Sequence, residues 1–243
     1  MFSLRGISKQ FGDHSVLKNI DLDIASGEIV VLVGSSGTGK STLLRCCNLL
    51  ETPDSGVIRV GDFQVDATNI TRHAAMQLRR RAAFVFQNYG LFKNKRALEN
   101  ITEGLIVVQG MKKEAANVIG REVLDKVGLS DRADAWPSQL SGGQQQRIGI
   151  GRALAQKGDI LIMDEPTSAL DPELTVEVQE LIKLLAKEQT TMLITTHDMA
   201  FAAQIASRIV FMADGEIIEQ GSPEQMINHA KDKRAQRFFQ HYC

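Results

Sequence analysis

The chain has little of what secreted, membrane-spanning or nucleic-acid-binding proteins require. Its 243 residues include only three cysteines, Cys46, Cys47 and Cys243, which do not make a disulfide framework. No strictly apolar run exceeds five residues, so no transmembrane helix is expected, and residues 1–6 have no apolar signal-peptide core. A formal net charge of −1 gives no electrostatic argument for nucleic-acid binding. We therefore expect a soluble, cytosolic enzyme, with Cys46 and Cys47 packed as small apolar side chains.

A glycine-rich stretch fits the pattern G-x-x-x-x-G-K-[ST] of a phosphate-binding P-loop. It follows an apolar, strand-like run, Ile29–Val33, and precedes a helical pattern. Glycines let the backbone turn its N–H groups toward a phosphate, and the helix adds the positive end of its dipole. Lys40 suits the β- and γ-phosphates, and the Ser41 hydroxyl suits Mg²⁺. A plain strand-to-helix turn is the disfavoured alternative. The expected nucleotide contacts are Gly34, Ser35, Ser36, Gly37, Thr38, Gly39, Lys40, Ser41 and Thr42.

The stretch before the P-loop, residues 3–24, is strand-like. It partly alternates apolar with polar residues, which is the pattern of half-buried antiparallel strands. Phe11 lies between two such runs, and periodicity alone favours a place for it in the core. The P-loop downstream raises a second interpretation, an aromatic plate for a nucleotide base. Val16 is a further expected nucleotide contact.

Polar residues follow three strand-like runs at the points where they end. They are Gln87 after 82–86, Asp164 and Glu165 after 160–163, and His197 after 192–195. In open α/β sheets, ligands bind beyond the carboxyl ends of the strands. Asp164 is expected to hold Mg²⁺ through water, and Glu165 to act as general base toward the attacking water. Gln87 is a candidate Mg²⁺ or water ligand, and His197 a partner for the γ-phosphate or the water. Singly, a strand-end glutamine is usually only exposed and a lone histidine usually structural.

The remaining segments are predicted as follows. Residues 89–157 are mainly helical, with helices over 97–108 and 112–127, and 223–243 are helical with Phe238, Phe239 and Tyr242 as packing residues. Residues 71–81 form a helix whose last three residues, Arg79–Arg81, are expected to be a solvated face. Ser141 and Gln144 match a capping box at a helix start. A serine hydroxyl and two glycine N–H groups there would equally serve as a second anion site.

Taken in order, these motifs resemble those of the ATP-binding subunits of ABC transporters over essentially the whole chain. In that family's terms they are Walker A at 34–42, the Q-loop at Gln87, the LSGGQ signature at 140–144, Walker B at 160–165, the D-loop at 168–171 and the H-switch at His197. LSGGQ between a P-loop and a Walker B is highly specific. Phe11 falls where the family stacks an aromatic residue, usually tyrosine, on adenine.

The resemblance implies an α/β fold. A P-loop NTPase (RecA-like) core with an antiparallel β-subdomain would comprise 1–88 and 158–243, and an inserted helical subdomain, 89–157, would carry the signature. It implies hydrolysis of ATP with Mg²⁺ held by Ser41, Gln87 and Asp164, and catalysis by Glu165, His197, Gln87 and Lys40. Two copies would dimerise head to tail, so that the signature of each contacts the nucleotide of the other. The signature contacts are Ser141, Gly142, Gly143 and Gln144.

The resemblance also implies partners and a location. Transmembrane permease subunits and, indirectly, a substrate-binding protein would place the chain at the cytoplasmic side of the inner membrane, with no nucleic acid involved. Residues 139–147 and the compact length are most similar to importers of polar amino acids. Motors for methionine import, lipoprotein release or cell division are the alternatives. A soluble ABC-type protein acting on DNA or ribosomes is disfavoured by the single P-loop and the absence of a long heptad run.

The chain departs from the family's pattern at two places. Phe92-Lys93 stands where Phe-Pro is common, in a loop that borders the surface expected to dock the membrane subunit. Gly149 and Gly151 stand in the signature helix where alanines are usual. Each glycine costs about 0.5–1 kcal/mol of helix stability relative to alanine.

Overall fold

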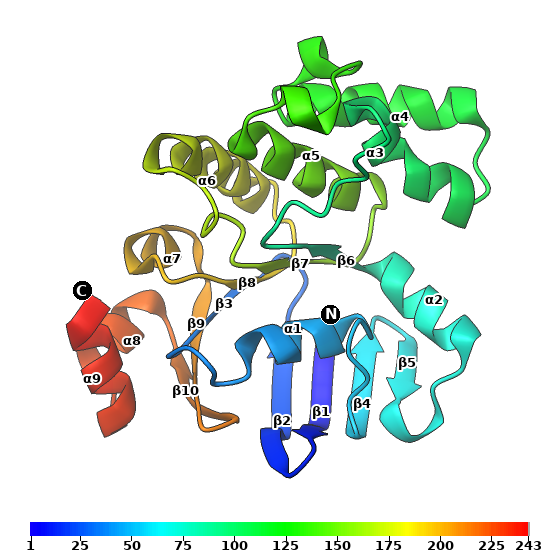
Figure 1. The fold of residues 1–243 in the computed structure, drawn as a ribbon. Coiled ribbons are helices and arrows are strands. Elements are labelled where there is room, and N and C mark those ends of the chain that lie inside the picture. The colour runs from blue at the N-terminus through cyan, green and yellow to red at the C-terminus, as the bar shows by residue number, and fades with distance from the viewer. Residues whose placement is uncertain (243) are drawn as a thin grey trace.

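The computed structural model describes residues 1–242, which build two β-sheets and the helices that cover them (Figure 1). The central sheet has the strand order β10-β9-β3-β8-β7-β6 and is parallel except for β10. Its strands are β3 (Ile29–Val33), β6 (Ala82–Val85), β7 (Ile160–Asp164), β8 (Met192–Thr195), β9 (Arg208–Ala213) and β10 (Glu216–Gly221). The second sheet is antiparallel, in the order β2-β1-β4-β5. Its strands are β1 (Phe2–Phe11), β2 (His14–Ile24), β4 (Ser55–Val60) and β5 (Phe63–Asp66).

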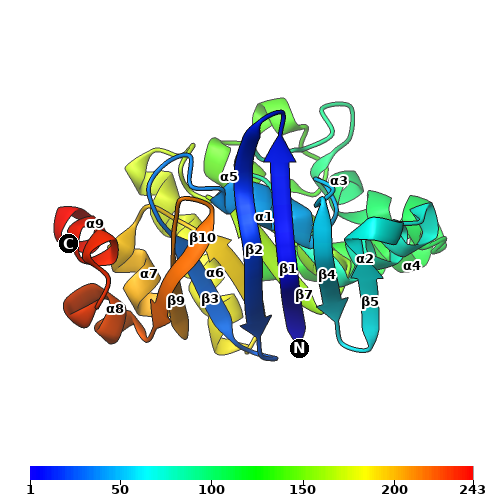
Figure 2. The same ribbon diagram turned by 90° about the horizontal axis from the view of Figure 1, so that it is seen from below.

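Helix α1 (Lys40–Cys47) lies between the two sheets, as Figures 1 and 2 show from the side and from below. The side chains of β3 alternate between two cores. Val30 and Leu32 join a core with α1 and the antiparallel sheet, whereas Val31 and Val33 join the core on the other face. A strand buried on both faces is apolar throughout, which is why the run before the P-loop is continuous. The α/β fold with an antiparallel β-sheet beside the P-loop core is confirmed.

The other face of the central sheet is covered by helices (Figure 1). These are α3 (Ala97–Glu103), α4 (Lys113–Lys126), α5 (Gly142–Ala155), α6 (Pro172–Lys187) and α7 (Met199–Ile205). Helix α2 (Arg72–Arg81) links β5 to β6, and α8 (Pro223–His229) and α9 (Lys233–Tyr242) end the chain. Between residues 89 and 157 the structure has helices and no strand, as expected.

The helix expected over 97–108 is not one regular α-helix. The α-helical hydrogen bonds stop at Glu103, and a π-helical turn, Gly104–Val108, follows. The wider turn is closed by the N–H of Gln109, which donates to the carbonyl oxygen of Gly104 at 3.2 Å. The next helix ends as predicted, with Gly128 in the left-handed region (φ 68°) where glycine is the favoured residue.

The expectation of a solvated face for the three arginines at the end of α2 holds only in part, because Arg79 is exposed whereas Arg80 and Arg81 are half-buried. The Arg79 guanidinium donates to the carbonyl oxygen of Leu49 at 2.6 Å, and Arg80 donates to the carbonyl oxygen of Val108. These side chains therefore tie α2 to the loop after α1 and to the end of the π-helical turn. The charge run did not indicate this because both acceptors are backbone atoms of distant segments.

Buried sulfur and aromatic side chains pack as expected. Cys46 and Cys47 are fully buried, and burial raises the pKa of the Cys46 thiol to about 12, so it stays protonated and inert. Phe238 and Phe239 pack on Phe211, with ring centroids 5.3 and 6.2 Å from its centroid. The Tyr242 side chain and Cys243, also named from the sequence, lie outside the described residues. No helix within residues 1–242 is long and apolar enough to cross a membrane.

The two unusual glycines of α5 lie at close contacts. A Cβ added to Gly149 would lie 3.0 Å from the carbonyl oxygen of Tyr89, whereas one added to Gly151 would lie 3.0 Å from a methyl group of Val123. Both distances are tighter than ordinary van der Waals contact, so the neighbour must move in each case. A side-chain methyl can shift more easily than a backbone carbonyl.

We expect Gly151→Ala to raise the free energy of unfolding by about 0.5 kcal/mol, because alanine is the better helix former. Gly149→Ala has the same gain in helix propensity but pushes against Tyr89, so its net gain is expected to be smaller. Urea unfolding of the two variants isolates the contact, since both lie in one helix. Equal stabilisation by the two substitutions would show that the Tyr89 backbone yields freely.

Candidate active site

The loop 34–39 joins β3 to α1, and two of its glycines are required by close approach. Gly34 and Gly39 have φ of 150° and 94°, in the region that favours glycine. A Cβ at Gly34 would lie 2.2 Å from the carbonyl oxygen of Met212, and one at Gly39 would lie 2.8 Å from that of Val16. The loop is therefore held against β9 and β2 in a shape that only glycine permits at these positions.

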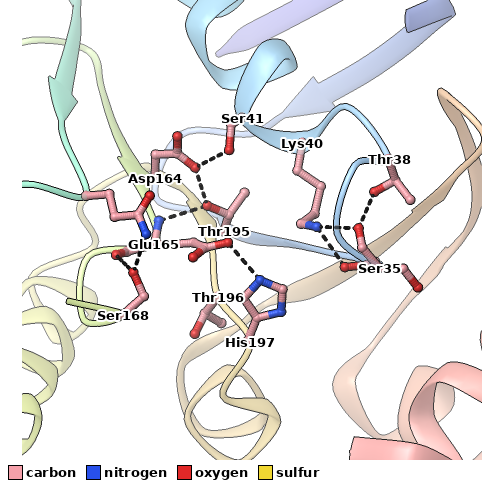
Figure 3. Close-up of polar contacts among 12 residues, drawn as sticks. Ser35, Thr38, Lys40, Ser41, Asp164, Glu165, Ser168, Thr195, Thr196 and His197 are labelled. Carbon is pink, nitrogen blue, oxygen red and sulfur yellow. Dashed lines mark hydrogen bonds and ion pairs between the residues drawn. The ribbon is translucent and has the colours of Figure 1, made fainter. Parts of the chain in front are cut away.

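Lys40 is folded back over this loop. Its ammonium Nζ donates to the carbonyl oxygens of Gly34 (2.7 Å) and Ser35 (2.9 Å), as Figure 3 shows for Ser35. The residue is only 6% exposed. Burial lowers the pKa of Lys40 from its ordinary value, and the carboxylates of Glu165 and Asp164 oppose that shift. A buried cation, held by two backbone carbonyls, thus lies at the loop within the field of two acidic side chains.

Asp164, at the carboxyl end of β7, is bound to the start of α1. The Ser41 hydroxyl donates to Asp164 Oδ1 at 2.9 Å, and the hydroxyl of Thr195 donates to the same oxygen at 2.9 Å (Figure 3). Asp164 and Thr195 are paired across the parallel strands β7 and β8. The structure therefore brings together two residues predicted from the sequence, Ser41 and Asp164. It adds Thr195, whose only sequence signal was its place at the end of a strand.

Glu165 and His197 form a pair beside the loop. Glu165 Oε1 lies 2.8 Å from His197 Nε2 (Figure 3). Glu165 has a positive φ of 45°, which is uncommon for a residue other than glycine and recurs at functional sites. This turn immediately after β7 directs the carboxylate toward the residue that follows β8.

Gln87 lies just beyond the expected strand end, but among the described residues its side chain makes no hydrogen bond to Ser41 or Asp164. Its amide Nε2 donates to the hydroxyl of Ser168 at 2.9 Å, and that hydroxyl donates to the backbone carbonyl of Glu165 at 3.1 Å. The Q-loop and the D-loop are thus linked next to the general-base candidate. The bond to Ser168 uses the amide nitrogen, so the amide oxygen Oε1, the atom that would ligate Mg²⁺, is not engaged by it.

Two neighbouring cavities border the loop 34–39. The first, about 200 Å³, is lined by Val16, Ser36, Gly37, Gly39, Lys40, Ser41, Thr42, Glu165 and His197. The second, about 510 Å³, shares Val16, Ser36 and Gly37 with the first and extends to Asp214, Gly215 and Arg234. The Arg234 guanidinium is paired with Asp214 at 3.1 Å. Sequence reasoning missed the contribution of the β9–β10 turn and α9, since nothing local relates them to the P-loop.

Phe11 is 48% exposed, so its interpretation as a core residue is wrong. Its ring lies under the ammonium of Lys9, 4.9 Å from Nζ to the ring centroid, and it does not line either cavity. An exposed aromatic ring before β2 stays compatible with the alternative, contact with a nucleotide base.

The signature residues lie apart from the two cavities. Ser141 and Gln144 form the predicted capping box at the start of α5, with the Gln144 N–H donating to Ser141 Oγ and the Ser141 N–H donating to Gln144 Oε1. No residue of 141–144 lines either cavity. Figure 1 shows α5 on the opposite face of the central sheet from α1. Within one chain, the signature and the P-loop are therefore separate.

Comparison with known proteins places this geometry in a family. The ABC transporter family model matches residues 17–168. The probable amino-acid import ATP-binding protein YxeO of Bacillus subtilis (strain 168) is 54% identical over 98% of this chain and 96% of its own. The glutamine transport ATP-binding protein GlnQ of Escherichia coli (strain K12) is 48% identical over 99% of both chains.

Solved structures agree with the sequence relatives. The ATP-binding cassette MJ0796, in a dimeric post-hydrolysis state bound to ADP and Pi, superposes with a TM-score of 0.80 at 33% identity. The alignment covers 92% of this chain and 99% of that one. The P-loop, the acidic pair after β7 and the histidine after β8 are thus set in a matching fold. The chain belongs to the ABC transporter family and is an ATP-binding, ATP-hydrolysing subunit of that family.

Proposed function

We propose that this ATPase powers the uptake of polar amino acids across a membrane. The observation that carries the proposal is near-full-length similarity to subunits named for amino-acid import. Besides the two relatives above, they include an L-cystine import protein at 47% identity and an arginine transport protein at 44%, both of Bacillus subtilis. Motors for methionine import, lipoprotein release or cell division are the alternative, and no observation on this chain favours them.

In the proposed mechanism the P-loop and Lys40 bind the phosphates of ATP. Backbone N–H groups of the loop and the start of α1 supply a positive potential for anions. Glu165 accepts a proton from the attacking water, and His197, 2.8 Å from it, holds that carboxylate and reaches toward the γ-phosphate. Both side chains line the same cavity as Lys40, which is the geometry that general-base hydrolysis needs.

Mg²⁺ fits the oxygen atoms at the start of α1. The Ser41 hydroxyl and the Asp164 carboxylate are 2.9 Å apart, and hydroxyl and carboxylate oxygens are the ligands this hard cation prefers. Ser41 would bind it directly and Asp164 through water, and Gln87 would offer its amide oxygen, which the bond to Ser168 does not engage. When bound, the ion neutralises charge that develops on the β- and γ-phosphates.

The separation of the signature from the P-loop supports a composite site. Two copies arranged head to tail would place Ser141, Gly142, Gly143 and Gln144 of one chain over the nucleotide bound to the other. The cassette MJ0796 has been solved as a dimer. Residues 1–88 and 158–243 would form the catalytic lobe and 89–157 the helical lobe. Closure on ATP would move the helical lobes.

An apolar groove beside the Q-loop supports docking of a transmembrane permease subunit. The groove has a volume of about 540 Å³, and its lining includes Phe86, Phe92, Val107 and Val108, all exposed. Exposed apolar patches of this kind mark interaction sites. Phe92 lines this groove, and Lys93, at which the chain departs from its family, is the next residue, so the departure would bear on which permease binds. Docking there would hold the chain at the cytoplasmic face of the inner membrane, with a substrate-binding protein engaged indirectly.

Co-purification with a membrane subunit, followed by ATPase assays in vesicles with a panel of amino acids, tests this proposal. We expect a polar amino acid, delivered by its binding protein, to stimulate ATP hydrolysis. Stimulation by methionine or a lipoprotein instead, with no response to polar amino acids, would favour the alternatives.

Phe11→Ala is expected to weaken ATP binding without loss of fold. Stacking of a base on an aromatic ring is worth about 1–3 kcal/mol, which is roughly a 5- to 150-fold change in Kd. The exposed ring adds little to stability, so the melting temperature should hardly change. Titration with a fluorescent ATP analogue measures the effect. An unaltered Kd would show that the ring makes no contact with the base.

A further inference from the structure

We propose that Thr195 is a positioning residue that sets both carboxylates of the adjacent acidic pair, Asp164 and Glu165. The inference rests on the roles proposed above for these two residues. It arises from a single hydroxyl group that bonds to both of them.

The hydroxyl of Thr195 is used in two directions. It donates to Asp164 Oδ1 at 2.9 Å and accepts from the backbone N–H of Glu165 at 2.9 Å. Thr195 is 1% exposed, so water does not compete for either bond. The parallel register that pairs Asp164 with Thr195 places the hydroxyl at the junction of the two acidic residues. Only a side chain that both donates and accepts can make this bridge.

The first consequence concerns the orientation of the Asp164 carboxylate. Hydroxyls from two elements, Ser41 on α1 and Thr195 on β8, converge on its Oδ1. In the part of the chain that the structure describes, no hydrogen bond is found to Oδ2. The two donors therefore fix the plane of the carboxylate and leave its second oxygen for a water ligand of Mg²⁺. Partners that orient metal-binding carboxylates in this way support metal affinity and activity.

The second consequence concerns the direction of the Glu165 side chain. A non-glycine residue at φ 45° persists only where its surroundings hold it. The hydrogen bond from the Glu165 N–H to the Thr195 hydroxyl helps to hold this conformation. It is made by the peptide unit at which the chain turns out of β7. That turn brings the Glu165 carboxylate to His197. Thr195 therefore links the residue proposed to hold Mg²⁺ to the one proposed as base.

The test separates the hydroxyl from the shape of the side chain. Thr195→Val keeps a β-branched side chain in β8 but removes the bridge, Thr195→Ala removes the hydroxyl without adding a methyl group, and Thr195→Ser keeps the hydroxyl. Thr191→Val is the matched control, because Thr191, which precedes the same strand, is also buried and its hydroxyl also accepts a backbone N–H, that of Gly27. Loss of the Thr191 hydroxyl should lower the free energy of unfolding but leave Asp164 and Glu165 in place.

Two readouts are measured on the full chain: steady-state ATP hydrolysis, and binding of a fluorescent ATP analogue as Mg²⁺ is titrated from excess EDTA. We expect Thr195→Val and Thr195→Ala to lower kcat. We also expect them to raise, by roughly 10- to 100-fold, the Mg²⁺ concentration that gives half of the Mg²⁺-dependent change in analogue binding. Affinity for the analogue in EDTA should stay at the wild-type value. Thr195→Ser should restore both quantities, and Thr191→Val should change neither.

Wild-type kcat and Mg²⁺ dependence in Thr195→Val or Thr195→Ala would overturn the proposal. So would a Thr195→Ser variant as impaired as Thr195→Val, since packing and not the hydroxyl would then be responsible. Should Thr195→Val not fold, the Thr195→Ala and Thr195→Ser pair decides between the same outcomes. A wild-type chain whose nucleotide binding does not respond to Mg²⁺ would contradict the proposed magnesium site itself, which is a different failure.

Discussion

Replacing Glu165 with glutamine is expected to stop ATP hydrolysis while leaving ATP binding intact. Glutamine has nearly the same shape and can keep the contact that the carboxylate makes with His197, but it cannot accept a proton from water. General bases contribute about 100- to 10,000-fold to a rate, so phosphate release should fall by that factor. The P-loop and Lys40 are untouched, and the Kd for MgATP should change little.

Phosphate release at saturating MgATP, together with equilibrium binding, measures both halves of this prediction. Glu188→Gln is a suitable control, because Glu188 is a carboxylate paired with Lys126 on the surface, away from both cavities. It should hydrolyse ATP at the wild-type rate. Near-normal turnover by Glu165→Gln would remove Glu165 from the role of general base.

Lys40→Ala is expected to lose most of its affinity for ATP. A hydrogen bond to a charged group is worth about 1.5–3 kcal/mol, so the loss of the ammonium should raise Kd by roughly 10- to 150-fold. The alternative cause, disturbance of the loop, is addressed by Lys40→Met, which keeps the length of the side chain but not its charge. If charge is what matters, the two variants should bind equally weakly.

The ammonium of Lys40 already lies in the phosphate-binding loop, so these substitutions remove it directly from the proposed site. In the structure its ammonium is held by two backbone carbonyls of its own loop, so the cation is already in place beside Ser35. Titration calorimetry with ATP under identical salt conditions compares the wild type with both variants. An unchanged Kd in Lys40→Ala would contradict the assignment of this lysine to the phosphates.

The fold and much of the site could be predicted because their signals are local in the sequence. The P-loop is one contiguous motif after an apolar strand. Asp164, Glu165 and His197 each follow a buried strand, and parallel strands gather their carboxyl ends at one edge. Ser41 and Asp164 were therefore expected together, and they lie 2.9 Å apart.

The missed features depend on contacts between distant segments. In the sequence, Thr195 is only the last residue of a buried strand. The register of β7 with β8 is what places its hydroxyl next to Asp164. Arg234 reaches the second cavity because α9 packs back beside the β9–β10 turn. Arg80 looked solvated because its acceptor is a backbone carbonyl at the end of the π-helical turn. No local pattern in the chain encodes these acceptors.

The exposure of Phe11 also could not be predicted from a local pattern. Periodicity favoured a core position, yet the ring is exposed at the end of β1, where that strand is still paired with β2 but extends beyond its pairing with β4 (Figure 2). Whether the ring contacts the base is decided by the affinity of Phe11→Ala.

The mass of Glu165→Gln in solution, measured by light scattering at low ionic strength, tests most directly whether one chain completes the site of another. With saturating MgATP we expect the mass of two chains, because the signature of each copy would cover nucleotide that the other cannot hydrolyse. Without nucleotide, or with Ser141→Arg added in the same background, we expect the mass of one chain. A single-chain mass at saturating MgATP would contradict the composite site.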